Sequence, residues 1–226
     1  SDIARFTDPN DSMRSWNTST ITDMSRMWAA KLTDSSLSLD LSQWDVSNVE
    51  TFVSMFDAGS GSQQSSIGAL DISGWNTQST TDMNRMFYRT SATSITGLGD
   101  LNTSLVSNMS QMFNNCPSGV VGQASETLAT KMVSGVLRWD VNNVVNFTSM
   151  FEDAEQLSDA TFPTNWNITS DGSKTVNMSA MFGGTPAGLT NITNLDAFAT
   201  KTINETWYGG TSYTAWNMSR VSSLSL

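Results

Sequence analysis

Ten asparagines of this chain stand in the pattern Asn-x-Ser/Thr, whose side-chain amide is the acceptor of N-linked glycans. They are Asn10, Asn17, Asn102, Asn108, Asn146, Asn167, Asn177, Asn191, Asn204 and Asn217. The chain is rich in neutral polar residues and poor in lysine, a composition that suits an extracellular, glycan-coated surface. We therefore predict an extracellular or cell-surface glycoprotein that carries N-glycans at some of these sites.

The sequence contains few residues that could form a catalytic site. There is no histidine, so Ser-His-Asp and Cys-His catalysis and every histidine-containing metal site are excluded. A carboxylate pair of the glycosidase kind could come from Asp40, Asp45, Asp71 and Asp140. The position after a repeated tryptophan, however, holds only Asp or Asn, which is typical of a side chain that caps backbone N–H groups. We predict that the protein is not an enzyme, and that the one cysteine, Cys116, is a small core residue.

Cofactors and charged partners are also disfavoured. The formal net charge of −10 leaves no basic patch for nucleic acid. No apolar run approaches the ~18 residues that membrane insertion requires. Calcium is the one cation that the many acidic residues could bind, but the sequence has no D-x-[DN]-x-[DN]-G loop. We therefore expect no cofactor, no nucleic-acid partner and no membrane insertion.

The asparagines and aspartates belong to a repeat. "WDVSNVETFVSMF" at 44–56 returns along the chain, in units that start near residues 16, 44, 75, 101, 139, 166, 187 and 216. Repeats of this period form solenoids, in which each unit buries its apolar face against its neighbours. We assign residues 1–15 to an N-terminal extension and residues 16–226 to the repeat solenoid.

Each unit reads as a strand, a turn and a short helix. In "LSLDLSQW" apolar residues alternate with polar ones, which predicts a strand over 37–41. Val49, Phe52, Met55 and Phe56 recur at i, i+3, i+6 and i+7, which predicts one face of a helix with Ser47 as its N-cap. The predicted fold is an α/β solenoid, a parallel stack of about eight such units. Two aromatic rows should run through its core. These rows are Trp16, Trp44, Trp75, Trp139, Trp166 and Trp216, and Phe56, Phe87, Phe113, Phe151 and Phe182.

The motifs "WDVSNVETFVSMF" and "VSNMSQMF" resemble the BspA-like surface-protein repeat, a divergent leucine-rich repeat that reads W-D-V-S-x-V-x-x-M-x-x-M-F. The resemblance covers roughly residues 14–226, and long insertions such as 114–135 and 170–175 depart from it. It implies a leucine-rich-repeat solenoid on a cell surface, often with a role in adhesion, and it implies no enzyme.

Two functions compete at this point. One is a structural subunit of a filament or surface layer, and the other is an adhesin that binds a protein or glycan through its solenoid face. The final unit, "WNMSRVSSLSL", supplies no equivalents of Met55 and Phe56, so we expect the chain to polymerise head to tail with itself. The alternative is that the sequence is a fragment whose capping unit is missing. The expected assembly residues are Ile3, Phe6, Trp216, Val221 and Leu224.

For the glycans, we expect Asn108, Asn146 and Asn177 to face solvent. Asn17, Asn102, Asn167 and Asn217 should instead be bonded inward as caps.

Overall fold

The computed structural model describes residues 13–34, 36–59, 66–90, 92, 94–116, 139–153, 176–181, 205–206, 212–213 and 221–223. Its strands are short: β1 (Thr33–Asp34), β2 (Leu39–Asp40), β3 (Ser66–Ile67), β4 (Ala69–Asp71), β5 (Ser94–Thr96), β6 (Val176–Asn177), β7 (Glu205–Thr206), β8 (Ser212–Tyr213) and β9 (Val221–Ser223). Two single-turn 3-10 helices, η2 (Met13–Ser15) and η3 (Leu98–Asp100), complete the elements.

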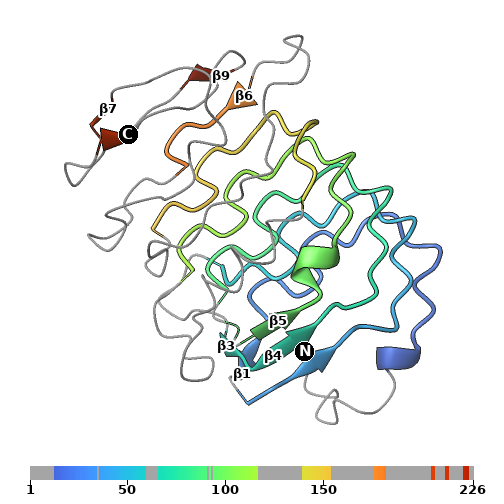
Figure 1. Ribbon diagram of the computed structural model, residues 1–226. Helices are drawn as coiled ribbons and strands as arrows, with labels where there is room; N and C mark the ends of the chain where they lie inside the picture. Colours follow the sequence, from blue (N-terminus) through green and yellow to red (C-terminus); the bar gives the residue numbers. More distant parts are fainter. Residues whose placement is uncertain are drawn as a thin grey trace.

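Successive repeats lie on one another in parallel, as Figure 1 shows. One residue of each repeat forms a parallel bridge with its equivalent in the next, in an uninterrupted series. The series is Asp23, Thr51, Asp82, Asn108, Asn146 and Asn177. We call these residues the ladder column, and the pass of chain around each of them a coil. The described part of the chain thus contains six stacked coils.

The predicted strands form a second line of pairing. β2, β4 and β5 make a three-stranded parallel sheet in which Leu39 pairs with Leu70, and Leu70 with Ile95. Leu39 and Leu70 are buried and the residues on either side of them are more exposed, as the alternating pattern predicts. β1 pairs with β3 and β6 with β9, both in parallel, whereas β7 and β8 are antiparallel. The strand predicted over 37–41 is therefore present, although only Leu39–Asp40 has strand pairing.

The predicted short helices are absent from the described residues, and this part of the expectation is wrong. Residues 53–56 and their equivalents form consecutive tight turns. In the first coil, Met27 and Lys31 donate backbone bonds to Met24 and Trp28, three residues back. Each turn contains one non-glycine residue with a left-handed backbone, for example Arg26 at a φ of 58°. Two four-residue turns place buried residues at nearly the same spacing as two helical turns, so the periodicity of the sequence could not separate them.

Backbone hydrogen bonds divide strictly between turns and neighbours. In the first coil the N–H groups of Met24, Arg26, Trp28 and Ala30 donate to the second coil, at distances of 2.7–3.0 Å. The intervening N–H groups close the turns within the coil. The same division recurs in the third and fourth coils, so almost every peptide group of this segment is paired. In a helix, all of these backbone bonds would run along the helix axis within one segment. In this chain, many of them join neighbouring coils instead.

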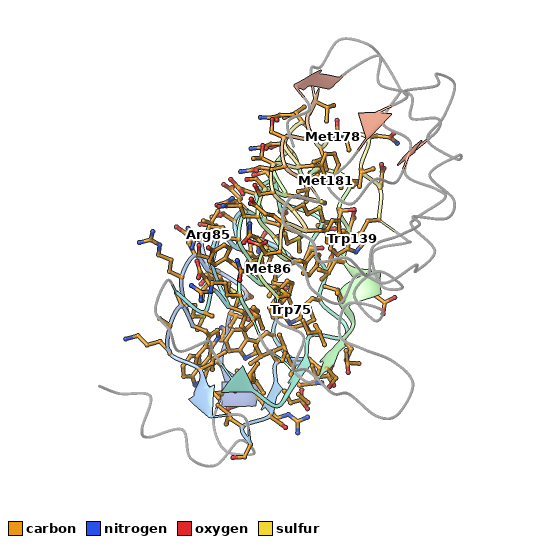
Figure 2. The ribbon with its side chains drawn as sticks, turned by 90° about the vertical axis from the view of Figure 1, so that its left-hand side faces the viewer. Trp75, Arg85, Met86, Trp139, Met178 and Met181 are labelled. Carbon is orange, nitrogen blue, oxygen red and sulfur yellow. The ribbon has the colours of Figure 1, made fainter. Side chains whose placement is uncertain are left out.

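A stack of aromatic rings fills the core. Phe56, Phe87, Phe113 and Phe151 lie face to face, with ring centres 5.5–5.7 Å apart. All four are buried, so this predicted row is confirmed as far as Phe151. Phe182, Trp166 and Trp216 lie outside the described residues. Figure 2 shows Trp75 and Met86 of the third coil toward one end of the stack, Met178 and Met181 of the sixth coil toward the other, and Trp139 between them.

The tryptophan row is confirmed in the interior of the stack but not at its first coil. Trp44, Trp75 and Trp139 are buried, and each indole N–H donates to a carbonyl of an earlier segment, such as Met13 for Trp44. Trp16 stacks on Trp44 with ring centres 5.9 Å apart, yet 38% of it is exposed. Trp16 belongs to the first described coil, and its exposure shows that the core position predicted for it is wrong.

Candidate functional site

The position after each repeated tryptophan forms an exposed line of turn-capping side chains. We call this the outer column; its described members are Asn17, Asp45, Asn76, Asn102 and Asp140, all exposed. In every one, Oδ1 accepts the backbone N–H of the residue two positions later, at 3.0–3.2 Å. The predicted capping role is therefore confirmed, because both Asp and Asn supply the same acceptor oxygen.

The hydroxyls that follow strengthen this cap. The Ser47 hydroxyl donates to Asp45 Oδ1 at 2.6 Å, and the Ser104 hydroxyl donates to Asn102 Oδ1 at 2.7 Å. The hydrogen bonds from Ser47 lower the pKa of Asp45 from its ordinary value, because they favour the ionised form. Ser25 lowers the pKa of Asp23 in the same way. Ser47, predicted as a helix N-cap, instead donates to this outer-column turn.

The ladder column repeats the arrangement at a second position. The ladder residue accepts the N–H two positions later through its side-chain oxygen, at 2.7–3.3 Å in all six coils. Asn108 also uses its amide nitrogen, which donates to Asp82 Oδ2 of the neighbouring coil at 3.2 Å. The side chains of this column are therefore bonded both within their own turn and, at Asn108, across the coil interface.

The exposure of the two columns is opposite to what we expected for the glycan sites. Asn108, Asn146 and Asn177 are only half-buried members of the ladder, each bridged to neighbouring coils. Asn17 and Asn102 are exposed, although they cap their turns as predicted. The expectation that capping withdraws the amide from solvent is wrong, because the cap uses Oδ1 and leaves Nδ2 outside that bond.

The carboxylates considered for catalysis serve the same turns. Asp40 accepts the N–H and hydroxyl of Ser42 and forms an ion pair with Arg14, and Asp71 accepts the N–H of Ser73. Each of these oxygens thus has a structural partner. Within the residues that the structure describes, no group of three or more His, Cys, Asp or Glu side chains could hold a metal ion.

Cys116 is a core residue, as predicted. Its buried thiol donates to the carbonyl of Phe87 at 3.4 Å, and one coil earlier Thr90 makes the equivalent bond to Phe56. Burial raises the pKa of Cys116 to about 12. A thiol with this pKa is almost entirely protonated at neutral pH and is a poor nucleophile.

Other predicted site residues cannot be placed. Val221 begins strand β9, and only its backbone is described. The remaining sequon and assembly residues lie outside the described residues. These are Asn10, Asn167, Asn191, Asn204, Asn217, Ile3, Phe6, Trp216 and Leu224.

Sequence reasoning missed a charged cluster and the ladder column. Arg85 Nε lies 3.0 Å from Asp57 Oδ2 of the preceding coil, and its guanidinium lies 3.9 Å from the centre of the Tyr88 ring. Asp57 and Arg85 are 28 positions apart and occupy different positions of their repeats, so the sequence did not indicate this contact. The ladder column did have one: Asn-x-Ser is the signature of an Asx turn as well as of a glycan acceptor. The turn accounts for the recurrence of this pattern at Asn108, Asn146 and Asn177 without reference to sugars.

Comparison with protein families identifies the chain. The family model described as "Mycoplasma protein of unknown function, DUF285" matches residues 3–120, 62–195 and 118–225. The matches together span nearly the whole chain, and the chain belongs to this family. The comparisons with curated proteins and with solved structures found no match. Among the described residues, no helix has the length and apolar character needed to cross a membrane.

Proposed function

We propose that the chain is a non-enzymatic structural subunit of an extracellular or cell-surface filament, in which the coils of one copy continue into the next. We further propose that the whole repeat region is a leucine-rich-repeat-like solenoid of the BspA-like surface-protein kind. Support comes from the repeated motif and from six parallel coils that pair in one register.

The open edge of the first coil carries this proposal. In the second coil the carbonyls of Thr51, Val53, Met55 and Asp57 accept bonds from the first coil. The equivalent carbonyls of the first coil accept no hydrogen bond within the described part of the chain. They are those of Asp23, Ser25, Met27 and Ala29. Four parallel acceptors at the spacing used by every other coil are a template for one more coil of the same kind.

An apolar surface accompanies these acceptors. Trp16 and Leu105 are the only large hydrophobic side chains exposed in the described residues. Trp16 lies in the first coil, where it stacks on Trp44, and a further coil packed against this coil would bury more of its exposed surface. The contact joins two different surfaces of the subunit, so it propagates as a filament rather than closing as a dimer.

The polar columns favour a scaffold over a binding module. A binding face needs donors and acceptors that remain available to a ligand. Here one side-chain oxygen of every described column residue is already bonded within its own turn. The alternative function, an adhesin that binds through the solenoid face, gains no specific support from these side chains.

Assembly is tested by comparing two matched charge substitutions. Trp16→Glu places a carboxylate in the first coil, whereas Leu105→Glu replaces a more exposed residue of the fourth coil. We expect the unmodified chain and Leu105→Glu to form filaments in electron micrographs at about 100 μM, and Trp16→Glu to stay monomeric by light scattering. Thermal melts establish that both variants are folded. A monomeric unmodified chain, or equal assembly of the two variants, would overturn the proposal.

A further inference from the structure

We propose that Asn17 and Asn102 of the outer column are N-glycan acceptor sites, and that Asn108, Asn146 and Asn177 of the ladder column are not. The inference adds a modification to the proposed extracellular role and rests on it for its biological setting. It reverses the preference that the sequence alone indicates, and four observations carry it.

The first observation is exposure. Asn17 and Asn102 are exposed, whereas the three ladder asparagines are half-buried within a bridged series. Coils in such a parallel pairing are about 4.8 Å apart. A sugar ring attached between two bridged residues would have to displace a neighbouring coil, while a sugar on the outer column extends into solvent.

The second observation is the state of the amide nitrogen. Attachment forms a bond from Nδ2 to C1 of an activated sugar, and the C1–oxygen bond to its diphosphate breaks. The diphosphate leaves with the electron pair, and one Nδ2 proton passes to a base of the transferase. Asn108 Nδ2 already donates to Asp82. In Asn102 the turn bonds from Ser104 use Oδ1 only, so the modified amide keeps its cap.

The third observation is the geometry of the sequon. The Ser104 hydroxyl lies 2.7 Å from Asn102 Oδ1, and the Ser19 hydroxyl lies 2.7 Å from Asn17 Oδ1. The folded chain therefore presents the amide and the hydroxyl of the motif together on an exposed turn. The hydroxyl bond alone does not select the outer column, because Ser110 makes the same bond to Asn108. Exposure separates the outer column from all three ladder asparagines, and a free Nδ2 also separates Asn102 from Asn108.

The fourth observation is spacing along the outer column. Asp45 and Asp140 cannot accept a sugar, and Asn76 is followed by Thr77 and Gln78, which is not a sequon. Asn17 and Asn102 are consequently three coils apart, or about 14 Å at 4.8 Å per coil. Two glycans at this distance do not crowd each other.

The test is glycosylation of the folded chain in solution. Chain produced without sugars is incubated with UDP-glucose and an asparagine glucosyltransferase that recognises Asn-x-Ser/Thr, and each site is quantified by peptide mass spectrometry. We expect Asn17 and Asn102 to be modified at least tenfold more than Asn108, Asn146 and Asn177. A synthetic peptide of residues 98–112 contains both Asn102 and Asn108, and it should lose this selectivity.

Two variants sharpen the result. Ser104→Thr keeps the hydroxyl and should preserve modification of Asn102, whereas Ser104→Ala should abolish it. Equal modification of Asn102 and Asn108 in the folded chain would overturn the inference. An unmodified Asn102 in a folded chain whose peptide is modified would overturn it as well. Because filaments are measured on unglycosylated chain, the two proposals fail independently of each other.

Discussion

At the scale of single residues, Asp45 of the outer column and Asp23 of the ladder column couple the stability of their turns to pH. The pKa of Asp45 is lowered in the folded chain by the hydroxyl and N–H of Ser47. A lowered folded-state pKa means that the stabilisation is complete above the unfolded value of about 3.9. It is lost as the pH falls through the folded value. Acid should therefore weaken these turns by protonating the cap.

The substitution Asp45→Asn tests this coupling. Asparagine keeps the acceptor oxygen, as Asn17 and Asn102 show at the equivalent position, and it does not titrate. We expect the variant to lose less thermal stability than the unmodified chain between pH 4.5 and about 2.5. Glu50→Gln is the control, because the Glu50 carboxylate accepts no hydrogen bond within the described residues. If Asp45→Asn and the unmodified chain respond identically to acid, the cap does not carry this coupling.

At the scale of the elements, the tight turns are where the backbone is strained. Ten non-glycine residues have a positive φ in the described part of the chain, and they recur at equivalent positions of the coils. For L-residues this conformation costs roughly 1 kcal/mol each, and glycine avoids the cost. The bonds between coils hold these residues in place.

Gln111→Gly should therefore stabilise the protein. Gln111 has a φ of 56°, its N–H is bonded to Thr148, and glycine keeps that bond. We expect a gain of about 0.5 kcal/mol in the free energy of unfolding, after the entropy that glycine loses on folding. Gln111→Ala should change stability little, and Gln111→Pro should be strongly destabilising, because proline cannot adopt this φ or donate the bond. Urea denaturation measures all three. A loss of stability in the glycine variant would show that the turn is not strained.

The limits of prediction from the sequence are also visible at this scale. Leu39 was placed in a strand correctly because alternation has one simple interpretation. Phe56 and Phe87 were placed in the core correctly because large apolar residues are buried in either local structure. The predicted helix was wrong because successive four-residue turns give the buried residues nearly the same spacing as a helix. The prediction that Asn102 is withdrawn from solvent was wrong because the sequence does not indicate which atom of the amide forms the cap.

At the scale of the whole molecule, stability depends on contacts between neighbouring coils. Asn108 and Asn146 bridge directly although 38 positions separate them, whereas 26 separate Asp82 from Asn108. The length of chain between two paired segments therefore varies without changing the register. Loop closure explains the tolerance, since each doubling of loop length costs only about 0.6 kcal/mol.

Deleting residues 120–127 tests this tolerance. We expect the free energy of unfolding to change by less than about 1 kcal/mol, because the deletion removes no described contact between the fourth and fifth coils. Phe87→Ala is the comparison, since Phe87 lies between Phe56 and Phe113 in the core. It should cost about 3–5 kcal/mol. A deletion as damaging as Phe87→Ala would mean that the inserted segment itself holds the coils together.

The division of hydrogen bonds between turns and neighbours also has a mechanical consequence. The bonds that join two coils point along the stack, so a pull along this axis loads all the bonds of one interface together and loads successive interfaces in series. The tensile strength of such a column is that of its weakest single interface, whatever its height. A stack of these coils can therefore lengthen by adding repeats. Each added repeat extends the stack without weakening the existing interfaces between coils.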